Sequence, residues 1–150
     1  MCVKNSTLVT VSVTILVSLL IGGTAFANQP IKWTADDPDL EWGPCPEFFP
    51  EGCGLAVLQG NPAEQNADVL LRVPGNSEVP HHWHRSAERM VLIQGEFVID
   101  NDGHDPVTMR AGTYAYGPPE LPHTAACRSD VDCLLFIAFE EPVDAEPTDG

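Results

Sequence analysis

Histidines and one glutamate are the residues of this 150-residue chain that are best placed for metal chemistry. In an extended strand, residues two positions apart point to the same face, so His82 and His84 can present their imidazoles side by side, and Glu88 shares their parity. His123 can join them from a later strand, which gives three nitrogens and one oxygen for a divalent ion, with water or substrate in the remaining positions. Each histidine alone is more often a surface or core residue. The combined H-x-H-x3-E and P-x4-H spacing favours a metal site.

Short apolar runs bounded by Gly, Pro, Asn and Asp would supply the strands that position these residues. The candidate strands are 55–58, 68–73, 89–93, 97–100, 107–109, 113–116, 123–127 and 134–139. Turn sequences such as Pro74-Gly75-Asn76 and Asn101-Asp102-Gly103 separate them. No window after the N-terminal apolar run has sustained helical periodicity, so the sequence predicts an all-β sandwich or barrel.

The predicted domain occupies residues 55–140 and has a segment of different character on each side. Residues 28–54 are rich in Pro, Asp, Glu and Trp and have neither strand nor helix periodicity, which predicts an irregular arm laid over the domain surface. Residues 141–150 are acidic and contain proline, which predicts a disordered tail.

Residues 1–27 have the order of a secretory signal peptide. Lys4 precedes an apolar run from Leu8 to Ile21, and the small-x-small tripeptide Ala25-Phe26-Ala27 follows. This order predicts cleavage before Asn28 and a periplasmic or secreted product with no stable membrane association. The alternative is an uncleaved anchor helix, because residues 8–26 approach the length that spans a bilayer.

Export changes how the cysteines are interpreted. Cys2 would be removed with the signal peptide, which leaves Cys45, Cys53, Cys127 and Cys133. Four cysteines in an exported small domain predict two disulfides, with three connectivities open. The pairs that are close in sequence, Cys45 with Cys53 and Cys127 with Cys133, are favoured. A zinc site is the alternative, although the chain has no C-x2-C spacing.

The composition argues against several partners. The chain has 22 Asp and Glu against 7 Lys and Arg, a formal charge of −15. Nucleic acids and anionic membranes are bound through Lys and Arg, so neither is expected as a partner. A hydrophobic content of 43% with 19% charged residues is enough to form a core, so the acidity does not predict a disordered chain.

The histidine clusters resemble the two sequence motifs of the cupin superfamily. The first motif is matched by His82, His84, Glu88 and Gly95 with both internal spacings kept, and the second by Gly112, Pro118 and His123. Gly75 lies one residue too far from His82 for the opening glycine, and Glu120 and Cys127 replace a usual glycine and asparagine. The resemblance covers residues 68–139 and implies a single-domain double-stranded β-helix, the jelly-roll barrel, with one divalent ion: Fe, Mn, Ni or Zn.

The resemblance also implies candidate reactions. Small cupin dioxygenases cleave β-diketones or similar oxygenated compounds at a three-histidine, one-glutamate metal site. By that analogy, the catalytic candidates are Glu88, which either ligates the metal or moves off as substrate enters, and Tyr116, or its neighbour Tyr114, which would orient the substrate. The alternative for both tyrosines is packing inside the barrel. Arg85 and Arg89 could hold a substrate carboxylate or form exposed ion pairs.

Two other classes of function stay open. Residues 86–96 are similar to the cupin-like domains of bacterial anti-sigma factors, which are cytoplasmic. Because of the predicted signal peptide, an anti-sigma role is not expected, and a non-catalytic periplasmic protein that binds or senses a metal or ligand stays open. Other single-domain cupins are isomerases or lyases of sugar acids, although the negative charge of this chain disfavours an anionic substrate. In each case the expected partner is a small molecule. Cupins also pair edge strands, which implies that a homodimer can form.

Overall fold

The structure, a computed structural model, describes residues 30–148 of the chain. Nearly all of these residues belong to the unit Lys32–Gly150. The predicted signal peptide, residues 1–27, lies outside the described residues. Between residues 30 and 148, no helix is long and apolar enough to cross a membrane.

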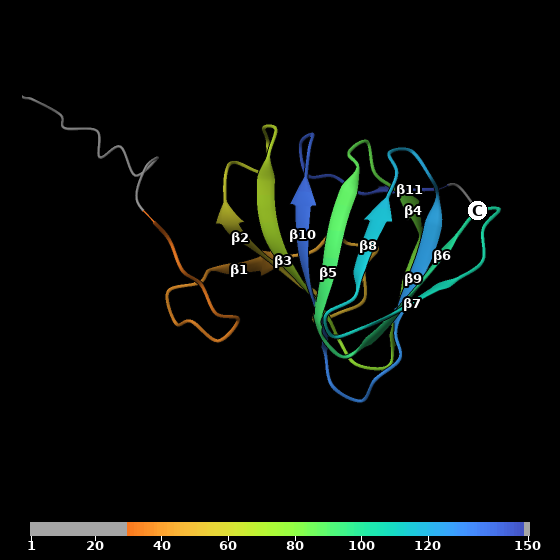
Figure 1. The fold of residues 1–150 in the computed structure, drawn as a ribbon, viewed down its shortest axis with the longest axis horizontal. Helices are drawn as coiled ribbons and strands as arrows, with labels where there is room; N and C mark the ends of the chain where they lie inside the picture. The colour runs from red at the N-terminus through yellow and green to blue at the C-terminus, as the bar shows by residue number, and fades with distance from the viewer. Residues whose placement is uncertain (1–29, 149–150) are drawn as a thin grey trace, which may run out of the picture. The chain divides into compact units, whose positions relative to one another are not determined.

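The described residues form eleven strands in two antiparallel sheets, which confirms the predicted all-β class (Figure 1). The strands are β1 (Trp42–Pro44), β2 (Gly54–Gln59), β3 (Ala67–Val73), β4 (Ser77–Trp83), β5 (Glu88–Gln94), β6 (Glu96–Asn101), β7 (Val107–Arg110), β8 (Tyr114–Gly117), β9 (His123–Cys127), β10 (Cys133–Phe139) and β11 (Glu146–Pro147). The first sheet has the order β1-β2-β3-β10-β5-β8, and the second has the order β11-β4-β9-β6-β7.

Alternating side chains of both sheets build the core between them. In β5, Glu88, Met90 and Leu92 are buried while Arg89 is exposed, as expected for a strand with one face toward a core. The inner side chains of the two sheets form one cluster, which includes Val69, Leu92, Leu135, Ile137, Val79, Phe97, Ile99 and Met109. The apolar core therefore fixes the strands β4, β5 and β9, which carry His82, Glu88 and His123.

The first part of the N-terminal arm packs on the outer face of the first sheet, and its later part, with Phe49, reaches the inner core. The arm, for which the sequence predicted an irregular segment over residues 28–54, contains the short strand β1, which pairs with β2. Leu40 and Trp42 of the arm pack with Leu70 and Leu134 in a second apolar cluster on this face. The indole nitrogen Nε1 of Trp33 donates a hydrogen bond to the Leu58 carbonyl. The arm is thus held by packing, one strand and a side-chain hydrogen bond.

The C-terminal segment, residues 141–148, is ordered where the sequence predicted a disordered tail. Its strand β11 pairs with β4, with Glu146 opposite Trp83 and Pro147 opposite His82. The backbone N–H of Val143 donates to the carbonyl of Pro62, and that of Thr148 donates to the carbonyl of His81. The tail prediction was wrong for residues 141–148, because an edge strand can satisfy the backbone of an acidic, proline-containing segment.

Both favoured disulfides are present. Cys45 pairs with Cys53, which closes the loop between β1 and β2, and Cys127 pairs with Cys133, which joins the end of β9 to the start of β10. The Cα–Cα distances are 5.6 and 5.7 Å, in the usual range for a disulfide. Cys127, which replaces the usual cupin asparagine, is therefore a structural residue.

Candidate metal centre

A β-bulge in β4 decides which histidines face the barrel interior. Val79 pairs with Ala125 and His82 pairs with His123, so three steps along β4 oppose two steps along β9. The extra residue shifts the parity of the strand, so that Val79 and His82 are both buried. Without this bulge, the buried position next to Val79 in the alternation would be His81.

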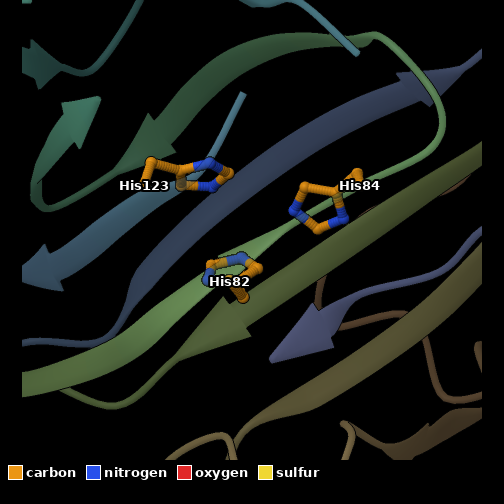
Figure 2. A group of neighbouring side chains, drawn as sticks. All are labelled: His82, His84 and His123. Atoms are coloured by element: carbon orange, nitrogen blue, oxygen red, sulfur yellow. The ribbon is translucent and has the colours of Figure 1, made fainter. Parts of the chain in front are cut away.

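Three imidazoles meet inside the barrel (Figure 2). His82 lies near the end of β4, His84 follows that strand, and His123 begins β9 opposite His82. The three side chains are 3–8% exposed as residues, and each can offer one nitrogen within 4.8 Å of the others. The structure therefore brings together the three histidines that the sequence predicted as candidate metal ligands.

Backbone carbonyls fix the tautomer of all three rings. Nδ1 of His82 donates to the Pro80 carbonyl at 2.7 Å, and Nδ1 of His123 donates to the Leu121 carbonyl at 3.1 Å. Nδ1 of His84 donates to the carbonyl of Asp144 in the C-terminal segment. A carbonyl only accepts, so each Nδ1 carries the proton and each neutral ring keeps its Nε2 lone pair free. This is the outer-shell arrangement that prepares imidazoles for a metal.

The local environment lowers the pKa of two of these rings, His82 and His123. Burial, and then the neighbouring rings of His123 and His84, lower the pKa of His82 from 6.5 to about 3. Burial also lowers the pKa of His123, although the Glu88 carboxylate opposes that shift. Unprotonated rings are the form that binds metal ions, so at neutral pH protons compete little for these two nitrogens.

Glu88 adjoins the histidines from the first sheet. It begins β5, is 5% exposed, and its Oε2 lies 3.4 Å from Nε2 of His84. Its partner across the β5–β8 ladder is Gly117, and a Cβ added there would lie 3.4 Å from Oε2. The carboxylate thus lies beside His84 with only a glycine opposite it, and it is not part of the histidine group whose ligand atoms all lie within 4.8 Å of one another.

The space between these groups suits a metal ion. A cavity of about 40 Å³ is lined by all three histidines and Glu88. One water molecule requires roughly 10–15 Å³ on this kind of measure, so an ion with a coordinated water fits. Three imidazoles and a carboxylate are a suitable donor set for Fe, Mn, Ni or Zn and do not select one of them.

Comparison with known proteins identifies the fold. Residues 32–142 match the family model described as the ChrR cupin-like domain. The chain belongs to the ChrR cupin-like family. It is 32% identical over 74 residues to the anti-sigma-E factor ChrR of Cereibacter sphaeroides, which is 49% of this cupin but 32% of that protein's length. This cupin therefore spans about a third of its curated relative.

Solved structures agree on the jelly-roll fold. The polyketide cyclase RemF of Streptomyces resistomycificus is similar with a TM-score of 0.65 and 14% identity, over 80% of this chain and 87% of that one. The DMSP lyase DddQ of Ruegeria pomeroyi is similar with a TM-score of 0.62 and 17% identity, over 73% of this chain and 61% of that one. At such low identity these likenesses establish the fold alone.

The cupin's second motif keeps its loop conformation despite the missing glycine. Glu120, which stands at the usual glycine position, has a φ of 60° in the left-handed region. Its N–H donates to the carbonyl of His84 at 2.8 Å. A non-glycine residue in this conformation costs about 1–3 kcal/mol, so the surrounding contacts must hold it there.

Tyr116 does not reach the centre. In the β5–β8 ladder it pairs with Arg89, whose side chain points outward, and it is 55% exposed; Tyr114 is 60% exposed. The structure therefore does not support a substrate-orienting role, nor the alternative of packing inside the barrel. Arg85 and Arg89 form the expected exposed ion pairs, Arg85 with Asp144 and Glu146, and Arg89 with Glu140.

The sequence did not indicate the residues that the two terminal segments contribute. A cavity of about 340 Å³ shares His84 and Glu88 with the metal centre. Phe49 of the arm lines both spaces, and its ring centroid lies 5.3 Å from that of His82. Asp144 lines the larger cavity from the C-terminal side. In the sequence, Phe49 is marked only as part of the aromatic pair Phe48-Phe49 between Cys45 and Cys53. Asp144 cannot be told from the other acidic residues near it in the sequence.

Proposed function

We propose that this cupin binds one divalent ion through Nε2 of His82, His84 and His123 with Glu88 as the fourth ligand, and that it is an exported metal-dependent enzyme of the dioxygenase type. Its substrate would be a diketone or a similar small oxygenated molecule. The observation that carries the proposal is the convergence of three imidazoles, each with Nδ1 hydrogen-bonded to a backbone carbonyl, beside a cavity large enough for a small molecule.

The cavity favours catalysis over a purely structural metal. A structural site is usually closed by protein ligands on every side, whereas a catalytic site keeps an open position. Here His84 and Glu88 form part of the wall of the 340 Å³ cavity, which falls in the size range of small-molecule sites. A substrate in that cavity would therefore lie against the metal ligands.

The protein groups around the centre have separable tasks. Backbone carbonyls hold the three rings, and the apolar side chains of Phe49, Leu71 and Ile137 exclude water from the space that both cavities share. Oε2 of Glu88 can accept a proton from an acidic C–H or O–H of a bound substrate. A bound first-row ion supplies Lewis acidity and, where it is redox-active, one-electron chemistry toward O2.

Export is proposed on two grounds. The sequence order of residues 1–27 is that of a signal peptide, and two disulfides are typical of proteins in an oxidising compartment. The expected partner is a small molecule, and a homodimer stays a proposal from family likeness.

Metal content and oxygen consumption test the enzymatic proposal. Protein purified from its native compartment should hold one first-row ion per chain and consume O2 with a β-diketone. His123→Ala should abolish both, while His104→Ala, an exposed histidine outside the site, should change neither. Metal bound by wild type and by His123→Ala alike would contradict the ligand assignment. Turnover that continues without O2 would instead favour an isomerase or lyase.

A second candidate is a periplasmic sensing or ligand-binding protein. The specific observation in its favour is the family itself, whose curated relative is an anti-sigma factor. Metal-dependent ligand binding without turnover on a diketone and sugar-acid panel would support this candidate and count against the enzyme.

A further inference from the structure

The 340 Å³ cavity beside the metal centre has mainly apolar walls. Its size lies at the lower end of the roughly 300–1,000 Å³ range of small-molecule sites. All three regions of the protein contribute apolar side chains: the arm, the barrel strands and the C-terminal segment. The main contributors are Phe49, Leu55, Leu71, Ile137, Phe139 and Val143. These walls suit a compact molecule with an apolar body.

The charged groups on the wall are acidic. Glu88 and Asp144 line the cavity together with His84, and neither lysine nor arginine is among the described lining residues. The guanidinium of Arg85 forms ion pairs with both Asp144 and Glu146, so two carboxylates share one positive charge. Such a wall favours a cationic ligand over an anionic one.

Asp144 has one carboxylate oxygen that the protein leaves without a hydrogen bond. Its backbone carbonyl accepts from Nδ1 of His84, and its Oδ1 accepts from the backbone N–H of Arg85 at 3.1 Å. Its Oδ2 is buried and accepts no hydrogen bond within residues 30–148. The guanidinium of Arg85 is 3.6 Å away, beyond hydrogen-bonding distance, and that side chain is 64% exposed. Buried acceptors normally have a hydrogen-bond donor, so a donor from a bound ligand would satisfy Oδ2.

We propose that this cavity binds a small, largely apolar organic cation whose ammonium N–H donates to Oδ2 of Asp144. The proposal goes beyond the proposed function, because its ligand is a cation and not the diketone named above, and it rests on that function only for the neighbouring metal centre. The His84 ring would separate the metal ion from the ammonium group of the ligand. Its Nε2 faces Glu88, and its Nδ1 donates to the carbonyl of Asp144. The cationic end of the ligand would thus lie on the side of His84 opposite to the metal.

Three probes of similar shape test the charge preference. Benzylamine, benzyl alcohol and benzoate carry an ammonium, a hydroxyl and a carboxylate on the same apolar body. Their dissociation constants are measured on the oxidised protein, with and without Zn²⁺, by NMR of the methyl groups of Leu71, Ile137 and Val143, which report on this cavity. In the metal-free protein, benzylamine should bind about tenfold or more tightly than benzoate, with benzyl alcohol between them.

A matched pair of variants locates the preference. Asp144→Asn keeps an oxygen for the Arg85 N–H but places an NH₂ where Oδ2 lies, so it should weaken benzylamine binding about tenfold and leave benzoate binding unchanged or stronger. Glu146→Gln alters the same segment and the same arginine pair outside the cavity, and should keep the wild-type preference.

The outcomes separate this inference from the metal centre. Tighter binding of benzoate than benzylamine at these methyl groups in the metal-free protein, equal losses in the two variants, or no binding of benzylamine would each overturn it. A parallel Zn²⁺ titration reports on the histidines. Absence of Zn²⁺ binding with an intact amine preference would reject the metal centre and leave the cation site standing.

Discussion

The barrel strands and the two terminal segments divide the work of this cupin. The strands carry three of the candidate metal ligands, with His82 and His123 paired across β4 and β9 and Glu88 at the start of β5. The N-terminal arm and the C-terminal segment supply Phe49 and Asp144 to the wall of the adjacent cavity. The barrel thus carries most of the candidate metal ligands, and the terminal segments contribute to the wall of the adjacent cavity.

The two regions are also stabilised differently. The barrel is held by continuous ladders and a shared apolar core, in which Leu92 and Leu135 are fully buried. The terminal segments are held by a disulfide, two short strands and ion pairs. Damage to the barrel should therefore affect the whole fold, and damage to the segments should affect the cavity first.

The largest effect is expected from a cavity made inside the barrel. Leu92→Ala removes a fully buried side chain of β5 and should lower the free energy of unfolding by about 2–5 kcal/mol. Chemical denaturation measures this change. The exposed neighbour Ile93, changed to Ala, is the control and should cost far less. Equal losses at the two positions would contradict the assigned strand faces.

A smaller effect is expected when the arm is released. The Cys45→Ala, Cys53→Ala double variant opens a short loop and should cost about 2–3 kcal/mol. Because the three histidines lie on the barrel, Zn²⁺ affinity should change less than fivefold. Denaturation and Zn²⁺ titration check the two parts of this prediction. A complete loss of Zn²⁺ binding in folded protein would show that the arm helps to form the metal centre.

Removal of the C-terminal segment should weaken the metal centre without unfolding the barrel. A chain that ends at Pro142 lacks Asp144, whose carbonyl accepts from Nδ1 of His84. Loss of such an outer-shell partner typically lowers metal affinity by about 10–100-fold. Titration with Zn²⁺ gives the affinity, and circular dichroism confirms the fold. Unchanged affinity would mean that His84 is oriented without this segment.

The smallest effect is expected where the barrel meets the C-terminal segment at the surface. Arg89 pairs with Glu140, and both side chains are about half exposed. Exposed pairs contribute roughly 0–1 kcal/mol, so Arg89→Ala should change the free energy of unfolding by less than about 1 kcal/mol. A loss as large as that of the disulfide variant would show that the two regions are coupled more strongly than described.

The grouping of His82, His84 and His123 could be predicted from the sequence through the spacing of the two motifs. His82, His84 and Glu88 lie within one short stretch, but His84 follows β4 and Glu88 begins β5, so the alternation of a single strand does not relate them. The bulge in β4 could not be predicted, since it depends on the pairing of Val79 and His82 with strand β9. The motif fixed which residues lie together, whereas tertiary pairing decided that they face inward.

The errors share one cause, which is long-range pairing. Tyr116 and Gly117 point to opposite faces because they are consecutive in a strand, and the register against β5 decides which of them faces inward. The segment that contains Asp144 looked like a frayed tail because its acidity and prolines favour neither helix nor core strand. Its edge pairing with β4 depends on residues about 60 positions earlier in the chain.

The most direct test of the central claim is the state of the three rings themselves. Long-range proton–nitrogen NMR on histidine-labelled, metal-free protein should show protonated Nδ1 and unprotonated Nε2 for His82, His84 and His123. One equivalent of Zn²⁺ should shift these three Nε2 resonances and leave that of His104 unchanged. Protonated Nε2 atoms in the metal-free protein, or three rings indifferent to Zn²⁺, would contradict the assignment of this cluster as a metal centre.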